Sequence, residues 1–260
     1  MPFAIRSLSV GGQPGVNGFR SLLLPPAGGT VGTFRHVVDA AAGREVWGVE
    51  YPGRGDRLDA PSAASVEQLA EQVTGELLRR EPAWVRRTVV VGFSMGGFVA
   101  VELAQRLRTR CGPAPAAVVV IGTPAPQRRV PGRSARDGER HLQEVLTGEG
   151  FQPGAGNRAS FEVWAYATHL LRSDVGLTRA YRGPAATALR CPLAALCGDR
   201  DPVATADATE AWRTWTTGPF LAATVPGGHL GLLADGRGAE FWTWMRRIER
   251  NVVVAGARDA

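Results

Sequence analysis

A buried strand that runs directly into a glycine-flanked serine constrains this chain most strongly. Thr88–Phe93 is a continuous apolar run, as expected for a strand that is covered on both faces of a sheet. The run ends in Gly92–Gly96, a Gly-x-Ser-x-Gly motif centred on Ser94, and Gly97–Arg110 then has the pattern of a helix. This context predicts a sharp, strained turn that holds the Ser94 hydroxyl above the sheet edge, at a helix N-terminus. A glycine-rich turn without chemistry is the alternative, and the flanking strand and helix argue against it.

The rest of the chain alternates short apolar runs with amphipathic stretches. Strands are predicted at Phe19–Leu24, Glu45–Glu50, Ala117–Ile121, Pro192–Cys197 and Phe220–Val225. Helices are predicted at Ser65–Arg80, where Ser65 and Gln68 form a capping box, and at Thr205–Trp215 and Gly238–Arg250. Strands separated by helices indicate an α/β fold with a mostly parallel, doubly wound sheet. With 260 residues, of which 44% are hydrophobic, the chain has enough apolar material for one such domain.

The alternation breaks between about Pro124 and Pro184. Two helices are predicted in this segment, Glu139–Leu146 and Ala159–Arg172, and no strand. A helical insertion into a parallel sheet often forms a lid over an active site. We therefore predict a core of residues 1–126 and 184–260, with residues 127–183 inserted as a helical lid. An insertion without a gating role is the alternative.

Charge and cysteine content narrow the possible functions. The net charge is +6, but all 30 basic residues are Arg and are scattered, so nucleic-acid binding is not expected. The three cysteines form no CxxC pair, which argues against a disulfide framework and a structural metal site. Neither a membrane span nor a signal peptide is recognisable. We expect a cytoplasmic monomer that binds no metal, membrane or nucleic acid.

A serine hydroxyl is a weak nucleophile and needs a base, which in turn needs an orienting acid. After a turn of this kind the acid comes next in the sequence and the His last. His36 precedes the serine, and His141 and His169 fall in the predicted lid. His229 lies in a Pro-Gly-Gly-His turn after the last apolar strand, so it is the predicted base.

The acid is expected after the penultimate strand of the sheet. Gly198–Pro202 supplies two carboxylates there, Asp199 and Asp201. Asp201 is preferred because it lies two residues beyond the Gly-Asp turn and can point back to the sheet edge, whereas Asp199 suits a capping role. The chemistry requires only one acid, so Asp199 remains the alternative.

Two backbone N–H groups are expected to form an oxyanion hole for the intermediate. The first is that of Met95, directly after the nucleophile, and the second comes from the loop after an early strand. In that loop, Leu24–Gly29, the predicted donor is Ala27, because Pro26 has no N–H. The two glycines that follow allow the backbone to bend.

The motifs together resemble those of the stand-alone, type II thioesterases of polyketide and nonribosomal-peptide assembly lines. The shared segments, in the expected order, are Pro25–Gly29, Tyr51–Arg57, Gly92–Gly96, Gly198–Pro202, Trp212–Phe220 and Gly227–His229. Tyr51–Arg57, which reads Tyr-Pro-Gly-Arg-Gly-Asp-Arg, is the most specific, because general esterases do not carry it at this place.

The resemblance implies an α/β-hydrolase fold with a helical lid. It also implies a serine thioesterase that uses Ser94, Asp201 and His229 and no cofactor of its own. The substrates would be acyl thioesters on the phosphopantetheine arm of an acyl or peptidyl carrier protein, and the role would be editing or release during assembly.

Pro26 and Phe93 depart from the family pattern, which usually has His at both positions. We expect them to line a less polar substrate entrance, together with Phe161 and Trp164 on the apolar stripe of the second lid helix. A drier entrance would favour acyl transfer or cyclisation by the same acyl-enzyme. A small-molecule esterase and a non-catalytic, carrier-binding scaffold are further alternatives.

A group of arginines offers a contact surface for a carrier protein, which is usually acidic around its attached serine. The group comprises Arg128, Arg129, Arg133 and Arg136, in the loop that leads into the predicted lid. Single surface ion pairs contribute little, so the expected effect is joint, as a faster encounter that weakens with salt. Solvated arginines without a partner are the alternative.

Overall fold

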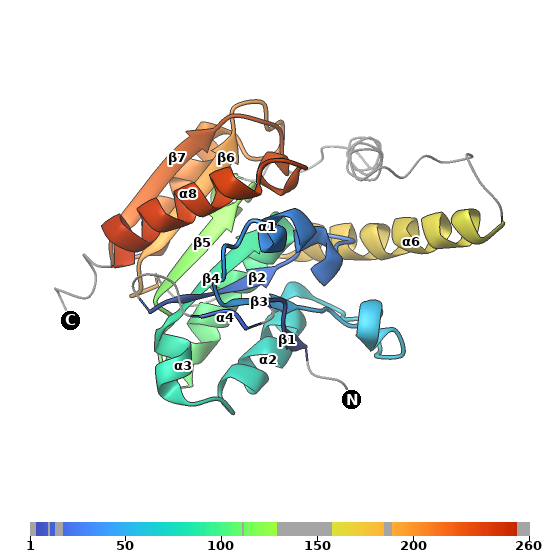
Figure 1. The fold of residues 1–260 in the computed structure, drawn as a ribbon, viewed down its shortest axis with the longest axis horizontal. Coiled ribbons are helices and arrows are strands. Elements are labelled where there is room, and N and C mark those ends of the chain that lie inside the picture. Colours follow the sequence, from blue (N-terminus) through green and yellow to red (C-terminus); the bar gives the residue numbers. More distant parts are fainter. Residues whose placement is uncertain are drawn as a thin grey trace.

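The computed structural model describes residues 4–9, 11–13, 18–110, 112–128, 158–184 and 189–253 (Figure 1). These residues form a seven-stranded sheet in the order β1-β3-β2-β4-β5-β6-β7. The strands are β1 (Ile5–Ser7), β2 (Arg20–Leu24), β3 (Val46–Val49), β4 (Thr88–Phe93), β5 (Ala117–Ile121), β6 (Leu193–Gly198) and β7 (Phe220–Val225). Only the edge strand β1 runs antiparallel to its neighbour, so the predicted mostly parallel sheet is confirmed.

Helices cover both faces of the sheet, as a doubly wound fold requires (Figure 1). The α-helices are α1 (Arg35–Asp39), α2 (Val66–Leu77), α3 (Pro82–Arg86), α4 (Met95–Thr109), α6 (Arg158–Ala180), α7 (Ala206–Glu210) and α8 (Gly238–Ile248). Short 3₁₀ segments lie at Val31–Phe34, Gly55–Arg57, Pro126–Arg128, Ala211–Trp215 and Gly231–Leu233, and a π turn at Glu249–Val253. Apolar residues of α2, α3 and α4 pack on one face, and those of α1 and α8 pack on the other.

Alternation along β4 shows how the strand supplies both cores. All six of its residues are buried. Val90 belongs to the core under α2 and α4, whereas Val89, Val91 and Phe93 belong to the core under α1 and α8. Because successive side chains of a strand point to opposite faces, a continuous apolar run is what a central, doubly covered strand needs.

The predicted helix start at Ser65 is observed with one difference. The Ser65 hydroxyl accepts the N–H of Gln68 at 3.1 Å, which caps α2. The Gln68 side chain accepts the N–H of Ala64 at 2.6 Å, one residue before the expected Ser65. Two backbone N–H groups at this end of the helix therefore find a side-chain oxygen, through a variant of the capping box.

The predicted lid is described only in part. Its second helix is longer than expected, since α6 spans Arg158–Ala180 where Ala159–Arg172 was predicted. The helix expected at Glu139–Leu146 lies outside the described residues. Figure 1 shows α6, in yellow, leading away from the end of the sheet at which β2 and β4 stop. In the described part of the chain, no helix combines the length and the apolar character that crossing a membrane requires.

Candidate active site

Ser94 lies in a strained turn between β4 and α4. Its φ of +50° and ψ of −113° place it outside the common regions for a non-glycine residue. The turn is possible only because glycines flank it. A Cβ on Gly92 would lie 2.1 Å from the Gly96 carbonyl oxygen, and one on Gly96 would lie 2.3 Å from that of Leu24. The strand–turn–helix context predicted from the sequence therefore forms the expected elbow.

The adjacent strand β5 fixes the elbow from one side. The N–H of Ser94 donates to the carbonyl of Ile121, the last residue of β5, at 2.8 Å. The hydroxyl of Thr123 donates to the Ser94 carbonyl at 2.9 Å. The Ser94 backbone is thus held at both its N–H and its carbonyl.

His229 brings a base to this hydroxyl from the turn after β7. Its Nε2 lies 2.9 Å from the Ser94 Oγ. Its Nδ1 lies 2.9 Å from each carboxylate oxygen of Asp201, which follows β6. The side chains of His229 and Asp201 are 5% and 0% exposed, so solvent does not screen their pairing. The structure therefore brings together the three residues proposed as nucleophile, base and acid.

Asp201 is held as an anion in spite of its burial. Burial alone would raise its pKa, but the hydrogen bond and charge of His229, together with two backbone amides, outweigh that effect and lower the pKa. Those amides belong to Val203 and Ala204 and donate to Oδ1 at 2.8 and 2.9 Å. An ionised Asp201 can orient the imidazole and stabilise the imidazolium that forms during the reaction.

Asp199 has the other role that its position suggested. Its Oδ1 accepts the N–H of Gly227 at 2.8 Å, which ties the turn after β6 to the turn before His229. The side chain of Asp199 is about half exposed. Among the described residues, the carboxylate that contacts the His229 imidazole is that of Asp201 and not that of Asp199. The geometry therefore favours Asp201 as the acid.

The other histidines lie elsewhere. His36 Nδ1 pairs with Asp235 at 3.2 Å near α1. His169 is exposed on α6, and His141 lies outside the described residues. Within the described ranges, no three His, Cys, Asp or Glu side chains gather as metal ligands would.

The two proposed oxyanion donors lie beside the elbow. The close approach of Gly96 to the carbonyls of Leu24 and Pro25 brings the loop after β2 against the start of α4. Among the described residues, no protein acceptor takes the N–H of Ala27 or that of Met95. Two unpartnered backbone donors on facing segments are what an oxyanion hole needs.

Phe93 lies in the core instead of at an entrance. It is fully buried, and its ring packs 5.6 Å from that of Phe34 and 6.0 Å from that of Phe241. Alternation along β4 carries its side chain to the face covered by α1 and α8. The expectation that Phe93 lines a substrate entrance does not fit this packing, so we no longer propose that role.

The other expected substrate-contacting residues fall into two groups. Pro26 is buried, and its carbonyl accepts the N–H of Gly29 at 3.0 Å in the turn that contains Ala27. Phe161 and Trp164 belong to the first two turns of α6, and their side chains lie outside what the structure describes. Their contact with substrate stays a prediction.

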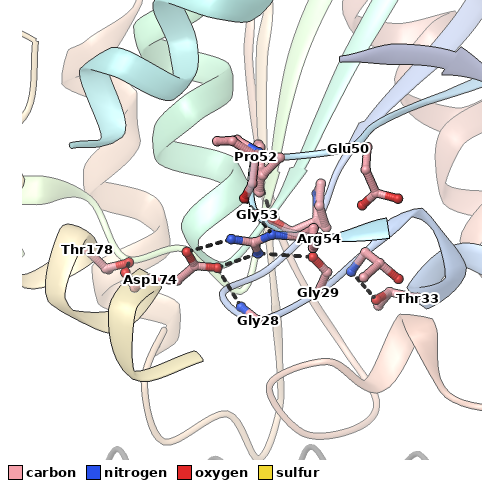
Figure 2. Close-up of polar contacts among 12 residues, drawn as sticks. Gly28, Gly29, Thr33, Glu50, Pro52, Gly53, Arg54, Asp174 and Thr178 are labelled. Carbon is pink, nitrogen blue, oxygen red and sulfur yellow. Dashed lines mark hydrogen bonds and ion pairs between the residues drawn. The ribbon is translucent and has the colours of Figure 1, made fainter. Parts of the chain in front are cut away.

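The sequence did not predict a buried ion pair that lies next to the loop Leu24–Gly29. Arg54 donates from Nη1 and Nη2 to the two carboxylate oxygens of Asp174, at 2.6 and 2.9 Å (Figure 2). Arg54 was noted only as part of a family-specific motif, and Asp174 not at all. The signal that could have suggested a partner is the charged Arg54 between two glycines, because a buried guanidinium must be paired or hydrogen-bonded.

Comparisons with known proteins agree with this geometry. The family model described as "Thioesterase domain" matches residues 22–243. A probable cadicidin biosynthesis thioesterase of Streptomyces griseus is 36% identical over 213 residues, which cover 81% of this chain and 57% of that protein. Thioesterase PikA5 of Streptomyces venezuelae is 35% identical over 218 residues, which cover 81% of this chain and 74% of that protein.

A solved structure extends the likeness to nearly the whole chain. The type II thioesterase BorB from the borrelidin biosynthetic cluster superposes with a TM-score of 0.73 at 30% identity. The match covers 96% of this chain and 97% of that one. The S. griseus relative is longer, and this chain spans a little over half of its length.

Proposed function

This chain belongs to the thioesterase family, with the fold of an α/β-hydrolase, and we propose that it hydrolyses acyl thioesters through an acyl-enzyme on Ser94. The observation that carries the proposal is the continuous contact from the Ser94 hydroxyl through His229 to Asp201, with 2.9 Å at each link. The family supports the reaction class, and the contacts support the role that we propose for each residue.

In the first step, the Ser94 oxygen attacks the carbonyl carbon of the acyl thioester. His229 Nε2 takes the hydroxyl proton as the new C–O bond forms, and the negative charge of Asp201 stabilises the imidazolium. The carbonyl oxygen becomes an oxyanion, for which the N–H groups of Ala27 and Met95 are the proposed donors. Such donors contribute about 3 kcal/mol each in other enzymes.

In the second half of the reaction the acyl group is released to water. The C–S bond breaks, His229 returns its proton to the departing thiolate, and the acyl group remains as an ester on Ser94. Water then attacks that ester while His229 takes one of its protons. The free acid leaves, and the proton returns to the serine oxygen.

Carrier-bound acyl groups are the substrates we propose. Two of the proteins named above are, by their names, thioesterases of cadicidin and borrelidin biosynthesis. The type II thioesterases that this chain resembles act on acyl groups held by carrier proteins. Editing or release during polyketide or nonribosomal-peptide assembly is therefore the role that fits best. Of the arginines expected to meet an acidic carrier, only Arg128 lies within the described residues, at the end of a 3₁₀ turn.

Hydrolysis is favoured over acyl transfer or cyclisation. The argument for transfer needed a dry entrance lined by Pro26 and Phe93, and Phe93 packs in the core against Phe34. With one of its two residues removed, that argument no longer stands. We retain the lid as part of the proposal, with α6 as its described helix.

Turnover of an acyl N-acetylcysteamine thioester, with the matched oxygen ester for comparison, tests the reaction class. We expect the free acid as product, loss of turnover in His229→Ala, and faster reaction of the thioester. A product in which the acyl group has moved to an added amine or alcohol, with little free acid, would instead assign transfer. Faster reaction of the oxygen ester would assign a small-molecule esterase.

A further inference from the structure

The family-specific segment Tyr51–Arg57 lies against the loop that carries the proposed oxyanion donor Ala27. The Tyr51 hydroxyl donates to the Pro25 carbonyl at 3.4 Å. Arg54 Nη1 donates to the Gly29 carbonyl at 3.2 Å. The segment therefore holds the loop on both sides of Ala27, at its second and its last residue.

A further polar contact to this loop comes from α6, more than a hundred residues later in the chain. Asp174 Oδ2 accepts the N–H of Gly28, the residue directly after Ala27, at 2.7 Å. The same oxygen accepts a hydrogen bond from Arg54 Nη1 at 2.6 Å. Figure 2 shows the carboxylate between the guanidinium of Arg54 and the amide of Gly28, and the guanidinium reaching on to Gly29.

The backbone in this loop forms a tight turn whose geometry depends on such contacts. Gly29 N–H donates to the Pro26 carbonyl at 3.0 Å, and Gly28 has a φ of +72°. A positive φ at the third residue is that of a type II turn, in which Ala27 is the second residue. Holding the N–H of Gly28 and the carbonyl of Gly29 therefore fixes the peptide units that follow Ala27.

Apolar packing places α6 over the same turn. Leu171 of α6 packs against Ala27. A Cβ on Gly28 would lie only 2.8 Å from the Leu171 Cβ, so helix and loop are in direct contact. About one turn earlier along α6, the hydroxyl of Tyr166 donates a hydrogen bond to the Gly53 carbonyl. The helix thus meets both the loop and the family-specific segment.

Stability alone does not explain a charged pair at this place. The side chains of Arg54 and Asp174 are 4% and 3% exposed. Removing two charges from water is expensive, and apolar residues of the same size would often stabilise a fold as well or better. Buried pairs are best understood where they specify one arrangement out of several, and here the pair joins the lid helix to the turn that carries Ala27.

We propose that Asp174 and Arg54 are positioning residues that hold the Ala27 N–H in the oxyanion hole and make its geometry depend on the docking of α6. With α6 docked, Asp174 holds Gly28 and Arg54 holds Gly29, so the Ala27 donor points to the reacting carbonyl oxygen. With α6 displaced, Gly28 loses its acceptor Asp174, and Arg54 loses the carboxylate that orients its guanidinium toward Gly29, so the turn is free to change. Acyl transfer to Ser94 is then efficient only under a docked lid helix. The inference rests on the proposed function for the role of Ala27.

Two double variants isolate the contact to Gly28. Arg54→Met with Asp174→Asn, and Arg54→Met with Asp174→Leu, both remove the buried charges and fill the same space. Only the Asn variant retains an acceptor for the Gly28 N–H. We expect kcat for a small acyl thioester to be at least tenfold lower in the Leu variant than in the Asn variant, with KM within threefold. The pH profile of kcat should be the same in both, because the two variants differ only at position 174 and neither side chain there is charged.

A fluorophosphonate supplies a readout that needs no thioester. The Ser94 oxygen displaces fluoride from phosphorus, its proton passes to His229, and the phosphoryl oxygen occupies the oxyanion hole. We expect labelling, followed by intact mass, to slow in the Leu variant by the same factor as kcat. If the wild-type protein is labelled but turns over no thioester, the proposed function fails, and the labelling rates still judge the positioning role.

Glu249→Gln is the matched control for loss of a buried ion pair. Glu249 accepts two hydrogen bonds from Arg44 Nη1, at 3.0 and 3.3 Å, away from the oxyanion loop. This variant should fold and keep kcat within twofold of wild type. Equal kcat and equal labelling in the two double variants would overturn the proposal, as would a loss of kcat in Glu249→Gln as large as that in the Leu variant.

Arg54→Lys keeps the test decisive if a double variant does not fold. A lysine keeps a positive charge beside Asp174. Its single ammonium group cannot donate to both Asp174 oxygens and to the Gly29 carbonyl in the planar geometry of a guanidinium. We expect kcat and labelling to fall together by at least threefold, with KM unchanged. Wild-type values for both in a folded Arg54→Lys protein would contradict the proposal.

Discussion

The imidazole of His229 lies 2.9 Å from the Ser94 hydroxyl, although 135 residues separate them in the sequence. Ser94 follows β4, and His229 follows β7, which is three strands away in the sheet. The turn of His229 must therefore cross the end of β5. It does so over Gly122, where a Cβ would lie 2.8 Å from the His229 carbonyl oxygen. A small residue after β5 is thus part of what allows the base to reach the nucleophile.

Replacing Ser94 should separate chemistry from backbone strain. Ser94→Ala and Ser94→Gly both lack the attacking oxygen and should show no turnover. Glycine tolerates the φ of +50° that serine and alanine do not, so Ser94→Gly should unfold with a free energy about 1 kcal/mol higher than Ser94→Ala. Urea unfolding of both variants measures the difference. Residual wild-type turnover in either would remove Ser94 as the nucleophile.

The two carboxylates after β6 should differ sharply when made neutral. Asp201→Asn keeps its one oxygen for the Val203 and Ala204 amides and turns an NH₂ donor toward His229 Nδ1, which selects the wrong tautomer, so a drop in kcat of about 10⁴ is expected. Asp199→Asn keeps an oxygen for the Gly227 N–H and does not touch the imidazole, so kcat should stay within about tenfold of wild type. Steady-state kinetics with one acyl thioester compares kcat of the two variants. The reverse ranking would show that the acid is Asp199.

Replacing a helical glycine by alanine should change the stability of the fold in opposite directions at Gly96 and at Gly75. In Gly96→Ala the new Cβ meets the Leu24 carbonyl oxygen, so a loss of at least about 2 kcal/mol in unfolding free energy is expected. In Gly75→Ala, within α2, the nearest atom is the end of the Arg79 side chain at 3.9 Å, so stability should rise by up to about 1 kcal/mol. Thermal unfolding compares them. Equal tolerance at both sites would contradict the described elbow geometry.

Glu50 should make stability depend on pH. Burial raises its pKa above the ordinary value, against the opposing effects of the Val31 amide and of Arg6 and Arg54. Since the folded state then binds the proton more tightly than the unfolded state, stability falls as pH rises from about 4.5 through the raised pKa. Glu50→Gln removes that ionisation.

The test of this prediction is a comparison of unfolding free energies at two pH values. Glu50→Gln should be more stable than wild type at pH 8, and the difference should shrink as the pH falls to 4. A variant that is less stable than wild type at pH 8 and matches it at pH 4 would show that the charged carboxylate stabilises the fold, which is the opposite sign.

Much of the site follows from the sequence because parallel strands end at one edge of a sheet. The elbow after β4, the acid after β6 and the base after β7 each follow an apolar run that can be recognised as a strand. The order rule for acid and base then selects among the carboxylates and histidines. Local pattern and topology together propose Ser94 and His229 and leave Asp199 and Asp201 as candidate acids, of which the contact with the imidazole favours Asp201.

Two features of the structure were not predicted correctly from the sequence, for different reasons. Phe93 was expected at the entrance because the family usually has His at this position, although period-two alternation with Val89 and Val91 already points its side chain into the core. The pair of Arg54 and Asp174 joins a loop to a helix 120 residues away, and no spacing rule connects them. Such long-range contacts appear only once the packing of α6 is known.

Intact-mass measurement of acylated carrier proteins tests the central claim most directly. A panel of carriers that bear different acyl groups is incubated with the wild-type protein and with Ser94→Ala, and each mass is followed in time. The account predicts that the wild-type protein removes the acyl mass from at least some carriers, leaving the phosphopantetheine thiol and free acid, while Ser94→Ala leaves every carrier acylated. Deacylation by Ser94→Ala at the wild-type rate, or wild-type protein that leaves every acyl group in place, would contradict it.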